Sequence, residues 1–261
     1  MRLGFLGTGA ITSAIVTGLD SAGGARHSIR LSPRNAEIAA DLAARFRGVS
    51  VASSNQNVLD ESEVVLIAVR PQVAGNVLSE LRFRADHHVI SLVSGFSLSR
   101  VSDLVSPAGG VARAVPLPSA AKRRSPTAIY PRDNRTAELF DSLGAAFAVD
   151  SETEFAAFCT TTATIAAYFA FADGAASWLT RHGIPPEKAR DYIARIYSGL
   201  ADIAIEQPQR DFQSLAADHA TAGGTNEQVL NDLVRHGVFE SFSQALDGVM
   251  RRVTADSRTP D

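Results

Sequence analysis

The sequence predicts a doubly wound α/β domain with a mostly parallel sheet, followed by an all-helical domain. Three observations support this. The apolar run Arg2–Leu6 is followed at once by the Gly7-Thr8-Gly9 turn and by apolar residues at helical spacing. Strand and helix patterns then alternate as far as residue 118, which is typical of a parallel sheet covered by helices. From about residue 152 the strand signals end and alanine-rich helical patterns begin, so we expect domains at 1–151 and 152–261.

Composition argues against several classes of protein. The chain has 261 residues and a net charge of -3, and its one dense basic patch, Lys122-Arg123-Arg124, is interpreted as a solvated loop. No nucleic acid is therefore expected as a partner. The single cysteine, Cys159, excludes an internal disulfide and is interpreted as a small buried hydrophobic residue of a cytoplasmic protein. No signal peptide and no apolar run of about 20 residues is found, so no membrane partner is expected.

The first turn has the chemistry of a pyrophosphate site. Gly7 permits the sharp turn, and Gly9 lets the backbone approach an anion. The free amides at the start of the helix, from Ala10 and Ile11 onward, offer the positive end of a dipole. Because Thr12 replaces the third glycine of the usual motif, the fingerprint is incomplete.

The end of the second predicted strand bears on the choice of cofactor. Sites that prefer NAD place a carboxylate there, whereas this chain has Ser32-Pro33-Arg34-Asn35. Nothing in that tetrapeptide repels a 2′-phosphate, and Arg34 can pair with one. The pattern favours NADP over NAD. The alternative is an exposed arginine at a helix start.

The remaining elements follow from periodicity. Strands are expected at His27–Leu31, Gly48–Ala52, Glu63–Val69, His88–Val93 and Gly110–Val115. Helices are expected at Ala36–Arg47, Val73–Leu81, Ser97–Val105, Glu154–Arg181 (whole or in two pieces), Pro185–Gln207, Asn226–His236 and Ser241–Arg252. Loops are expected at Gly23-Gly24 and Ser53–Asn57, and disorder only at Asp256–Asp261. The strand ends near residues 7–12, 32–35, 55, 68–72 and 94–96 should line one crevice.

A second constellation lies between the later helices, at Asp218–Gln228. Thr225 and Gln228 have the spacing of a capping box, which would start the helix at Thr225. Gly223 and Gly224 before it would expose backbone amides and make a second anion site. The alternative is an ordinary glycine-rich loop with a good cap, and the local pattern does not choose between them.

Together these stretches resemble the pyrroline-5-carboxylate reductase family over almost the whole chain. The segment from Gly223 to Phe239 is similar to its signature, and Phe5–Ile11 to its opening. Ala68–Gln72 resembles its Ala-Val-Lys-Pro-Gln motif, and Val89–Gly95 the next strand end. Arg113–Pro116 is similar to its Arg-x-Met-Pro.

The resemblance implies a Rossmann domain and a helical domain for dimerisation and substrate binding. It implies reduction of pyrroline-5-carboxylate, a cyclic imine carboxylate, to proline with NADPH or NADH, in a homodimer or higher homo-oligomer. By position, the expected cofactor-binding residues are Gly7, Thr8, Gly9, Ala10, Ile11, Ser32, Arg34, Asn35, Asn55, Ala68, Val69 and Pro71. Gly223, Gly224, Thr225 and Asn226 are expected at the substrate, with Thr225 and Asn226 in the catalytic polar roles.

Three departures from the family pattern all fall near the expected substrate. Asn226 stands where the family has a threonine beside the imine nitrogen; an amide can both donate and accept there. Ala163–Tyr168 replaces Gly-Ser-Gly-Pro-Ala-Tyr, and Leu117-Pro118-Ser119 replaces Asn-Thr-Pro. The cofactor motifs are kept better than the substrate motifs, so a different imine or ketimine carboxylate stays open.

Two other classes of function also stay open. A hydroxy- or amino-acid dehydrogenase would need a general base in the helical half, where Lys188 is the only lysine and is expected in a surface turn. A non-catalytic NADP-binding sensor would need no base at all. No metal is expected, because the six histidines are scattered at predicted surface or helix-end positions: His27, His87, His88, His182, His219 and His236.

Overall fold

The fold is described by a computed structural model that covers residues 1–21 and 27–256. The chain forms two compact units, Met1–Cys159 with Met250–Asp261, and Thr160–Val249. Residue 152, the first after the predicted domain boundary, is also the first residue of helix α7 (Glu152–Thr161). The predicted Gly23-Gly24 loop and most of the predicted disordered tail lie outside the described residues.

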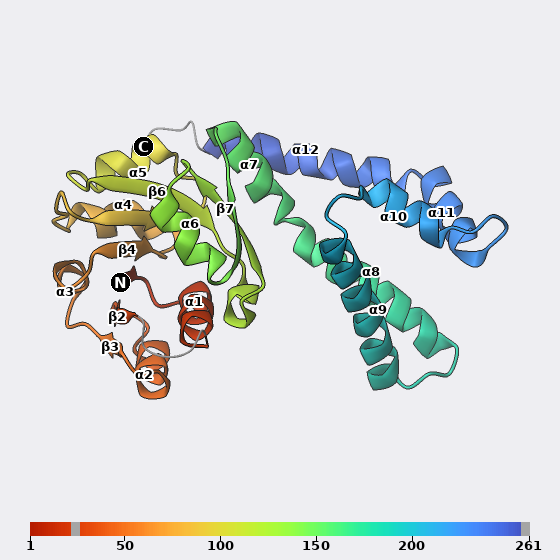
Figure 1. Cartoon of the computed structure of the whole chain (residues 1–261), viewed down its shortest axis with the longest axis horizontal. Helices are drawn as coiled ribbons and strands as arrows, with labels where there is room; N and C mark the ends of the chain where they lie inside the picture. The colour runs from red at the N-terminus through yellow and green to blue at the C-terminus, as the bar shows by residue number, and fades with distance from the viewer. Residues whose placement is uncertain (22–26, 257–261) are drawn as a thin grey trace. The chain divides into compact units, whose positions relative to one another are not determined.

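The first unit is built on one sheet with the strand order β3-β2-β1-β4-β5-β6-β7-β8 (Figure 1). Its strands are β1 (Arg2–Leu6), β2 (Ser28–Leu31), β3 (Val49–Val51), β4 (Val64–Ile67), β5 (His88–Ser91), β6 (Gly110–Val115), β7 (Ser125–Tyr130) and β8 (Gly144–Ala148). Neighbours from β3 to β6 are parallel, β7 is antiparallel to β6, and β8 is parallel to β7. The predicted fold class is confirmed. The strand order reverses between β1 and β4, which is where such sheets bind dinucleotides.

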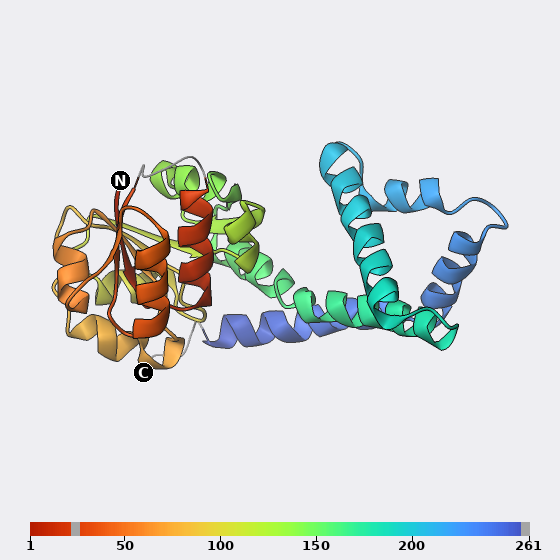
Figure 2. The same ribbon diagram turned by 90° about the horizontal axis from the view of Figure 1, so that it is seen from below.

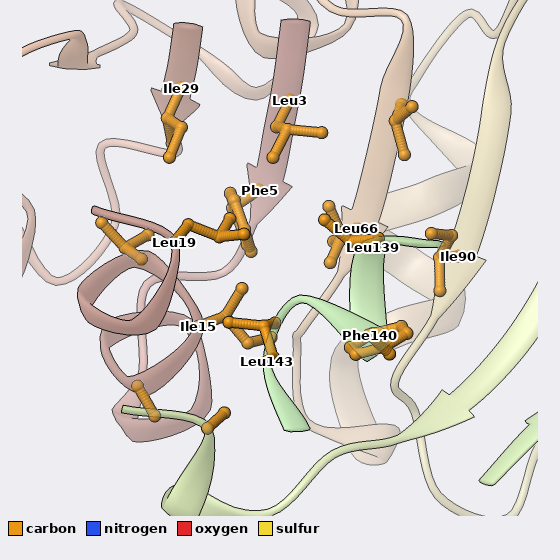
Figure 3. Close-up of a cluster of buried hydrophobic side chains, with 14 of the residues drawn as sticks. Leu3, Phe5, Ile15, Leu19, Ile29, Leu66, Ile90, Leu139, Phe140 and Leu143 are labelled. Carbon is orange, nitrogen blue, oxygen red and sulfur yellow. The ribbon is translucent and has the colours of Figure 1, made fainter. Parts of the chain in front are cut away.

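Helices cover both faces of this sheet. They are α1 (Ala10–Asp20), α2 (Ala36–Arg45), α3 (Asn55–Asp60), α4 (Pro71–Ser79), α5 (Leu98–Leu104) and α6 (Asn134–Asp141). Successive side chains of a strand point to opposite faces, so Leu66 enters one core cluster while Val65 and Ile67 enter the other. Figure 3 shows the first cluster, in which Leu66 of β4 lies with Ile15 of α1 and Phe140 of α6.

Four elements between residues 118 and 148 are absent from the sequence-based prediction. They are the 3-10 helix η1 (Pro118–Lys122), β7, α6 and β8. Helix η1 packs tightly on α1, since a Cβ on Gly18 would lie 2.1 Å from the carbonyl oxygen of Ala120. Lys122, Arg123 and Arg124 at its end are exposed, as predicted.

The prediction of a loop over Ser53–Asn57 is wrong from Asn55 onward, because α3 begins at that residue. Ser54 caps this helix, accepting a hydrogen bond from the Asn57 amide at 3.1 Å. A serine followed by polar residues is compatible with either a loop or the start of a helix. The helix forms here because it buries Val58 and Leu59.

The second unit contains only helices among its described elements. Beyond α7 the chain forms α8 (Thr164–Arg181), α9 (Pro186–Glu206), α10 (Phe212–His219), α11 (Thr225–Arg235) and α12 (Val238–Asp256) (Figures 1 and 2). The helix expected over Glu154–Arg181 is thus in two pieces, and α10 was not predicted. Lys188 lies exposed in the first turn of α9, not in the surface turn expected for it.

The second unit exposes large apolar side chains. Phe169, Tyr192 and Ile205 are 64%, 59% and 73% exposed. One helical run of the described chain, Glu152–Arg181, is long and apolar enough to cross a membrane by length and composition, because a window of 18 residues within it has a mean hydropathy of 1.5. This corrects the expectation that no apolar run reaches such a length. It is weak evidence for a membrane, since buried helices of soluble proteins pass the same test.

Candidate active site

The first candidate site is the turn between β1 and α1. Gly7 has φ +102, and a Cβ there would lie 2.5 Å from the carbonyl oxygen of Ala68, so this turn is in direct contact with the end of β4. Gly9 is the N-cap of α1 in extended conformation, and a Cβ there would meet nothing within 4 Å. The backbone is thus open to a ligand at Gly9, while at Gly7 it is closed by packing.

Hydrogen bonds tie this turn to the end of β2. The Gly7 amide donates to Ser32 Oγ at 3.0 Å, and Thr8 Oγ1 donates to the Ser32 carbonyl at 2.9 Å. Asn35 Nδ2 donates to the Thr8 carbonyl at 3.0 Å. Ser32 and Thr8 are buried. Three of the predicted cofactor residues therefore hold the turn in shape through their side chains.

Thr12, in the third position of the glycine motif, has a role that the motif does not anticipate. It is fully buried, and its Oγ1 donates to the Gly7 carbonyl at 2.8 Å. A glycine there would allow close packing of helix against strand. In this chain the Thr12 hydroxyl instead links the start of α1 to the Gly7 carbonyl and so stabilises the turn.

The other predicted cofactor residues surround the same strand ends. Ala10 and Ile11 form the first turn of α1, which carries no acidic side chain. Arg34 is exposed, and no partner for it is recorded within the described residues. Asn55 and Pro71 are the first residues of α3 and α4, and Ala68 and Val69 follow β4. An uncrowded helix N-terminus beside an exposed arginine fits an anionic dinucleotide.

The second candidate site is the loop before α11, and here the structure corrects the predicted cap. Gly224 is the N-cap, with φ -83 and ψ 165, and no side chain caps the helix from that position. Thr225 is the first helical residue rather than the cap. Gly223, with φ +74, and the extended Gly224 turn the chain, which places Thr225 inside the first turn.

The amides of this loop are partly engaged. The Gly223 amide donates to Glu227 Oε2 at 2.7 Å, and the Gly224 amide donates to the Thr221 carbonyl at 2.8 Å. Asn226 Nδ2 donates to the His219 carbonyl at 3.1 Å. Thr225 and Asn226 are exposed in this unit. The contact between Glu227 and Gly223 is the feature that sequence reasoning missed, since the sequence showed only an acid in the first turn.

An ion pair between a buried arginine and a partly exposed glutamate supports the end of β6, in the stretch that resembles the Arg-x-Met-Pro motif. Arg113 is 7% exposed and lies 2.5 Å from Glu152 Oε2, with its guanidinium 4.4 Å from the Phe155 ring centroid. Glu152 Oε1 accepts from the Leu98 amide at 2.7 Å, which joins α5 to α7. Burial raises the pKa of the neighbouring Cys159 thiol to about 11, so this thiol is no nucleophile near neutral pH.

The histidines of the two units occupy different environments. His182, His219 and His236 lie at helix C-termini, as expected, and each bonds through Nδ1 to the carbonyl four residues earlier. His87 and His88 are buried, which corrects the surface positions expected for them. No group of metal-ligating side chains is found within the described residues.

Comparison with known proteins finds two family models, one in each half of the chain. Residues 2–95 match the family model described as NADP oxidoreductase coenzyme F420-dependent, and residues 152–255 match the model described as pyrroline-5-carboxylate reductase dimerisation. Fold and sequence therefore define an oxidoreductase with a nucleotide-binding unit and a helical dimerisation segment. Over its whole length the chain is similar to pyrroline-5-carboxylate reductases, as its motifs predict.

Three relatives illustrate the similarity. The pyrroline-5-carboxylate reductase of Haemophilus influenzae is 25% identical, and the match covers 96% of this chain and 95% of that protein. The crystal structure of 1-pyrroline-5-carboxylate reductase from Streptococcus pyogenes is 26% identical, with a TM-score of 0.84 and 98% of both chains covered. The Plasmodium falciparum pyrroline carboxylate reductase with NADP bound, at 16% identity, shares the fold, with a TM-score of 0.83 and 98% of both chains covered.

Proposed function

We propose that this protein reduces a cyclic imine with NADPH, and that conversion of pyrroline-5-carboxylate to L-proline is the reaction to test first. The observation that carries the proposal is the open start of α1 at Gly9, in a chain whose second half matches the pyrroline-5-carboxylate reductase dimerisation model. Several relatives of similar length bear the name of that reductase.

In this proposal the first unit binds the cofactor. The amides of the first turn of α1 hold the pyrophosphate, and Arg34 pairs with the adenosine phosphate. Asn55, Ala68, Val69 and Pro71 lie along the cofactor towards the nicotinamide. When bound, NADPH supplies the hydride. NADH is accepted less well, because it lacks the phosphate that Arg34 would hold.

The second unit supplies the polar contacts to the imine. A protonated imine is already electrophilic, so the protein needs mainly to orient it and to hold its proton. We assign these roles to Thr225 and Asn226, whose hydroxyl and amide are exposed at the start of α11. Gly223 and Gly224 are the proposed contacts of a substrate carboxylate.

The same proposal includes a homo-oligomer of cytoplasmic enzyme. The dimerisation match spans α7 to α12, the region that exposes Phe169, Tyr192 and Ile205. A second copy that covers these side chains would explain the apolar run at Glu152–Arg181 without a membrane.

The test is oxidation of NADPH by the purified protein with pyrroline-5-carboxylate, followed by the absorbance of the reduced nicotinamide, with NADH in parallel. We expect turnover with a preference for NADPH. Asn226→Thr should change kcat/KM for the imine and leave the Kd for NADPH unchanged. NADPH binding without oxidation by any C=N compound would contradict the proposal and favour a binding protein.

A further inference from the structure

The side-chain carboxylate of Glu227 is bound to the glycine loop of its own chain. It extends from the first turn of α11 back over the glycine loop, where Oε2 accepts the Gly223 amide at 2.7 Å. That amide is one of those assigned to the substrate carboxylate in the proposed function. Only one acceptor can take a single N–H at this distance with good geometry, so an incoming carboxylate has to displace Glu227 from Gly223.

The charges around the loop oppose a second anion. Between residues 207 and 228 the sequence has one arginine, Arg210, against the three carboxylates of Asp211, Asp218 and Glu227. Arg210 forms an ion pair with Asp218 and also donates to the Ser214 carbonyl at 3.2 Å. The segment therefore offers no unpaired arginine or lysine to a substrate carboxylate, while Glu227 repels it directly.

Asn226 also presents an acceptor to its surroundings. Its Nδ2 is directed to the His219 carbonyl, which leaves Oδ1 as the end of the amide available to a ligand. An oxygen acceptor next to the Glu227 carboxylate suits an N–H donor with positive charge. A protonated cyclic imine has such a group, whether or not it carries a carboxylate.

We propose that Glu227 is a specificity-determining residue that disfavours imines bearing a carboxylate and shifts the preference of the enzyme towards cyclic imines without one. This inference rests on the proposed function, because it concerns the substrate of that same site. Glu227 acts in two ways: its oxygen occupies the Gly223 amide, and its charge repels an anion while favouring an iminium cation.

Two variants separate the two effects. Glu227→Gln keeps an oxygen acceptor for the Gly223 amide but removes the charge, whereas Glu227→Ala removes both. The matched control is Glu187→Gln, an exposed acid in the first turn of α9 with no recorded contact to the glycine loop. The measurement is kcat/KM for 1-pyrroline and for pyrroline-5-carboxylate with NADPH, with the melting temperature as a check on folding.

We expect the ratio of kcat/KM for 1-pyrroline to that for pyrroline-5-carboxylate to fall about tenfold in Glu227→Gln, which corresponds to about 1.4 kcal/mol for the loss of one exposed like-charge contact, and further in Glu227→Ala. The ratio should be unchanged in Glu187→Gln. Equal ratios in the wild type and both Glu227 variants would overturn the inference.

A binding measurement separates failure of this inference from failure of the proposed function. With NADP⁺ saturating, the affinity for L-proline and for pyrrolidine is measured by calorimetry. Glu227→Ala should bind L-proline about tenfold more tightly than the wild type does and pyrrolidine no more tightly. If no imine is reduced but this selective gain is seen, the proposed reaction fails and the role of Glu227 stands. If imines are reduced and the gain is absent, Glu227 has no such role.

Discussion

The two compact units differ most in how they bury their side chains. The first packs two apolar clusters against the two faces of its sheet, with Leu3, Phe5 and Leu66 fully buried in one of them (Figure 3). In the second, Ala189 and Thr160 are the only residues classed as buried among those described. A helical unit of this size that buries so little has no core of its own to stabilise it. The first unit therefore has the build of a self-sufficient domain, whereas the second needs a partner surface.

The sharpest test of the first unit uses two glycines of one turn. Gly7→Ala puts a Cβ against the Ala68 carbonyl at positive φ, so we expect a loss of about 3 kcal/mol in the free energy of unfolding. Gly9→Ala meets open space, so it should keep the stability and weaken NADPH binding instead. Urea unfolding and NADPH titration distinguish them. Equal stability losses in both variants would contradict the different roles assigned here.

The second unit is tested through its exposed aromatic face. Phe169→Asp in α8 should shift the protein towards the monomer in light scattering, with a loss of about 2 kcal/mol or more in association free energy. Val51→Asp, at an apolar position of β3 in the first unit that is 41% exposed, serves as the control and should leave the oligomer intact. If the wild type stays monomeric at micromolar concentration, the claim that the second unit needs a partner surface is wrong.

Cofactor preference gives a smaller effect, confined to the first unit. Arg34→Ala removes the exposed guanidinium proposed to hold the 2′-phosphate, so the Kd for NADPH should rise about tenfold while that for NADH stays the same. The matched control is Arg47→Ala, since Arg47 is also exposed but follows the C-terminal end of α2, whereas Arg34 precedes its N-terminal end. If the affinities for NADPH and NADH fell equally, Arg34 would not contact the 2′-phosphate.

The buried histidines give the smallest effect, a dependence of stability on pH. His87 Nδ1 accepts the Arg84 amide at 3.1 Å, so the ring is neutral there, and burial lowers its pKa below the usual 6.5. The unfolded state takes up the proton first as pH falls, so stability is complete above about 6.5 and declines below it. The urea midpoint should therefore fall between pH 7.5 and 5.5, and fall less in His87→Asn than in the wild type. If His236→Asn reduced the fall of the urea midpoint by as much as His87→Asn does, the pH dependence would not come from the burial of His87.

Much of the first unit could be predicted from sequence because its strands are short apolar runs separated by helical periods. The region of β7 and β8 could not. Pro126 lies inside β7, where proline usually argues against a strand, and β8 is Gly-Ala-Ala-Phe-Ala, with few residues that favour strands. These strands exist because β7 pairs with β6 and β8 pairs with β7, and pairing between distant segments leaves little trace in local composition.

The sequence by itself determined the resemblance to pyrroline-5-carboxylate reductases, the order of the strands up to β6 with the helices between them except α3, and the positions of the glycine turns. Local patterns suffice for these, since turns and periodicity depend on neighbouring residues. Only the tertiary structure decided that Gly224 caps α11 and that Glu227 reaches the Gly223 amide. A long acidic side chain in a first turn has several directions open to it. Its direction depends on the conformation of Gly223 and Gly224, which makes Gly224 the N-cap and Glu227 the third helical residue, within reach of the Gly223 amide.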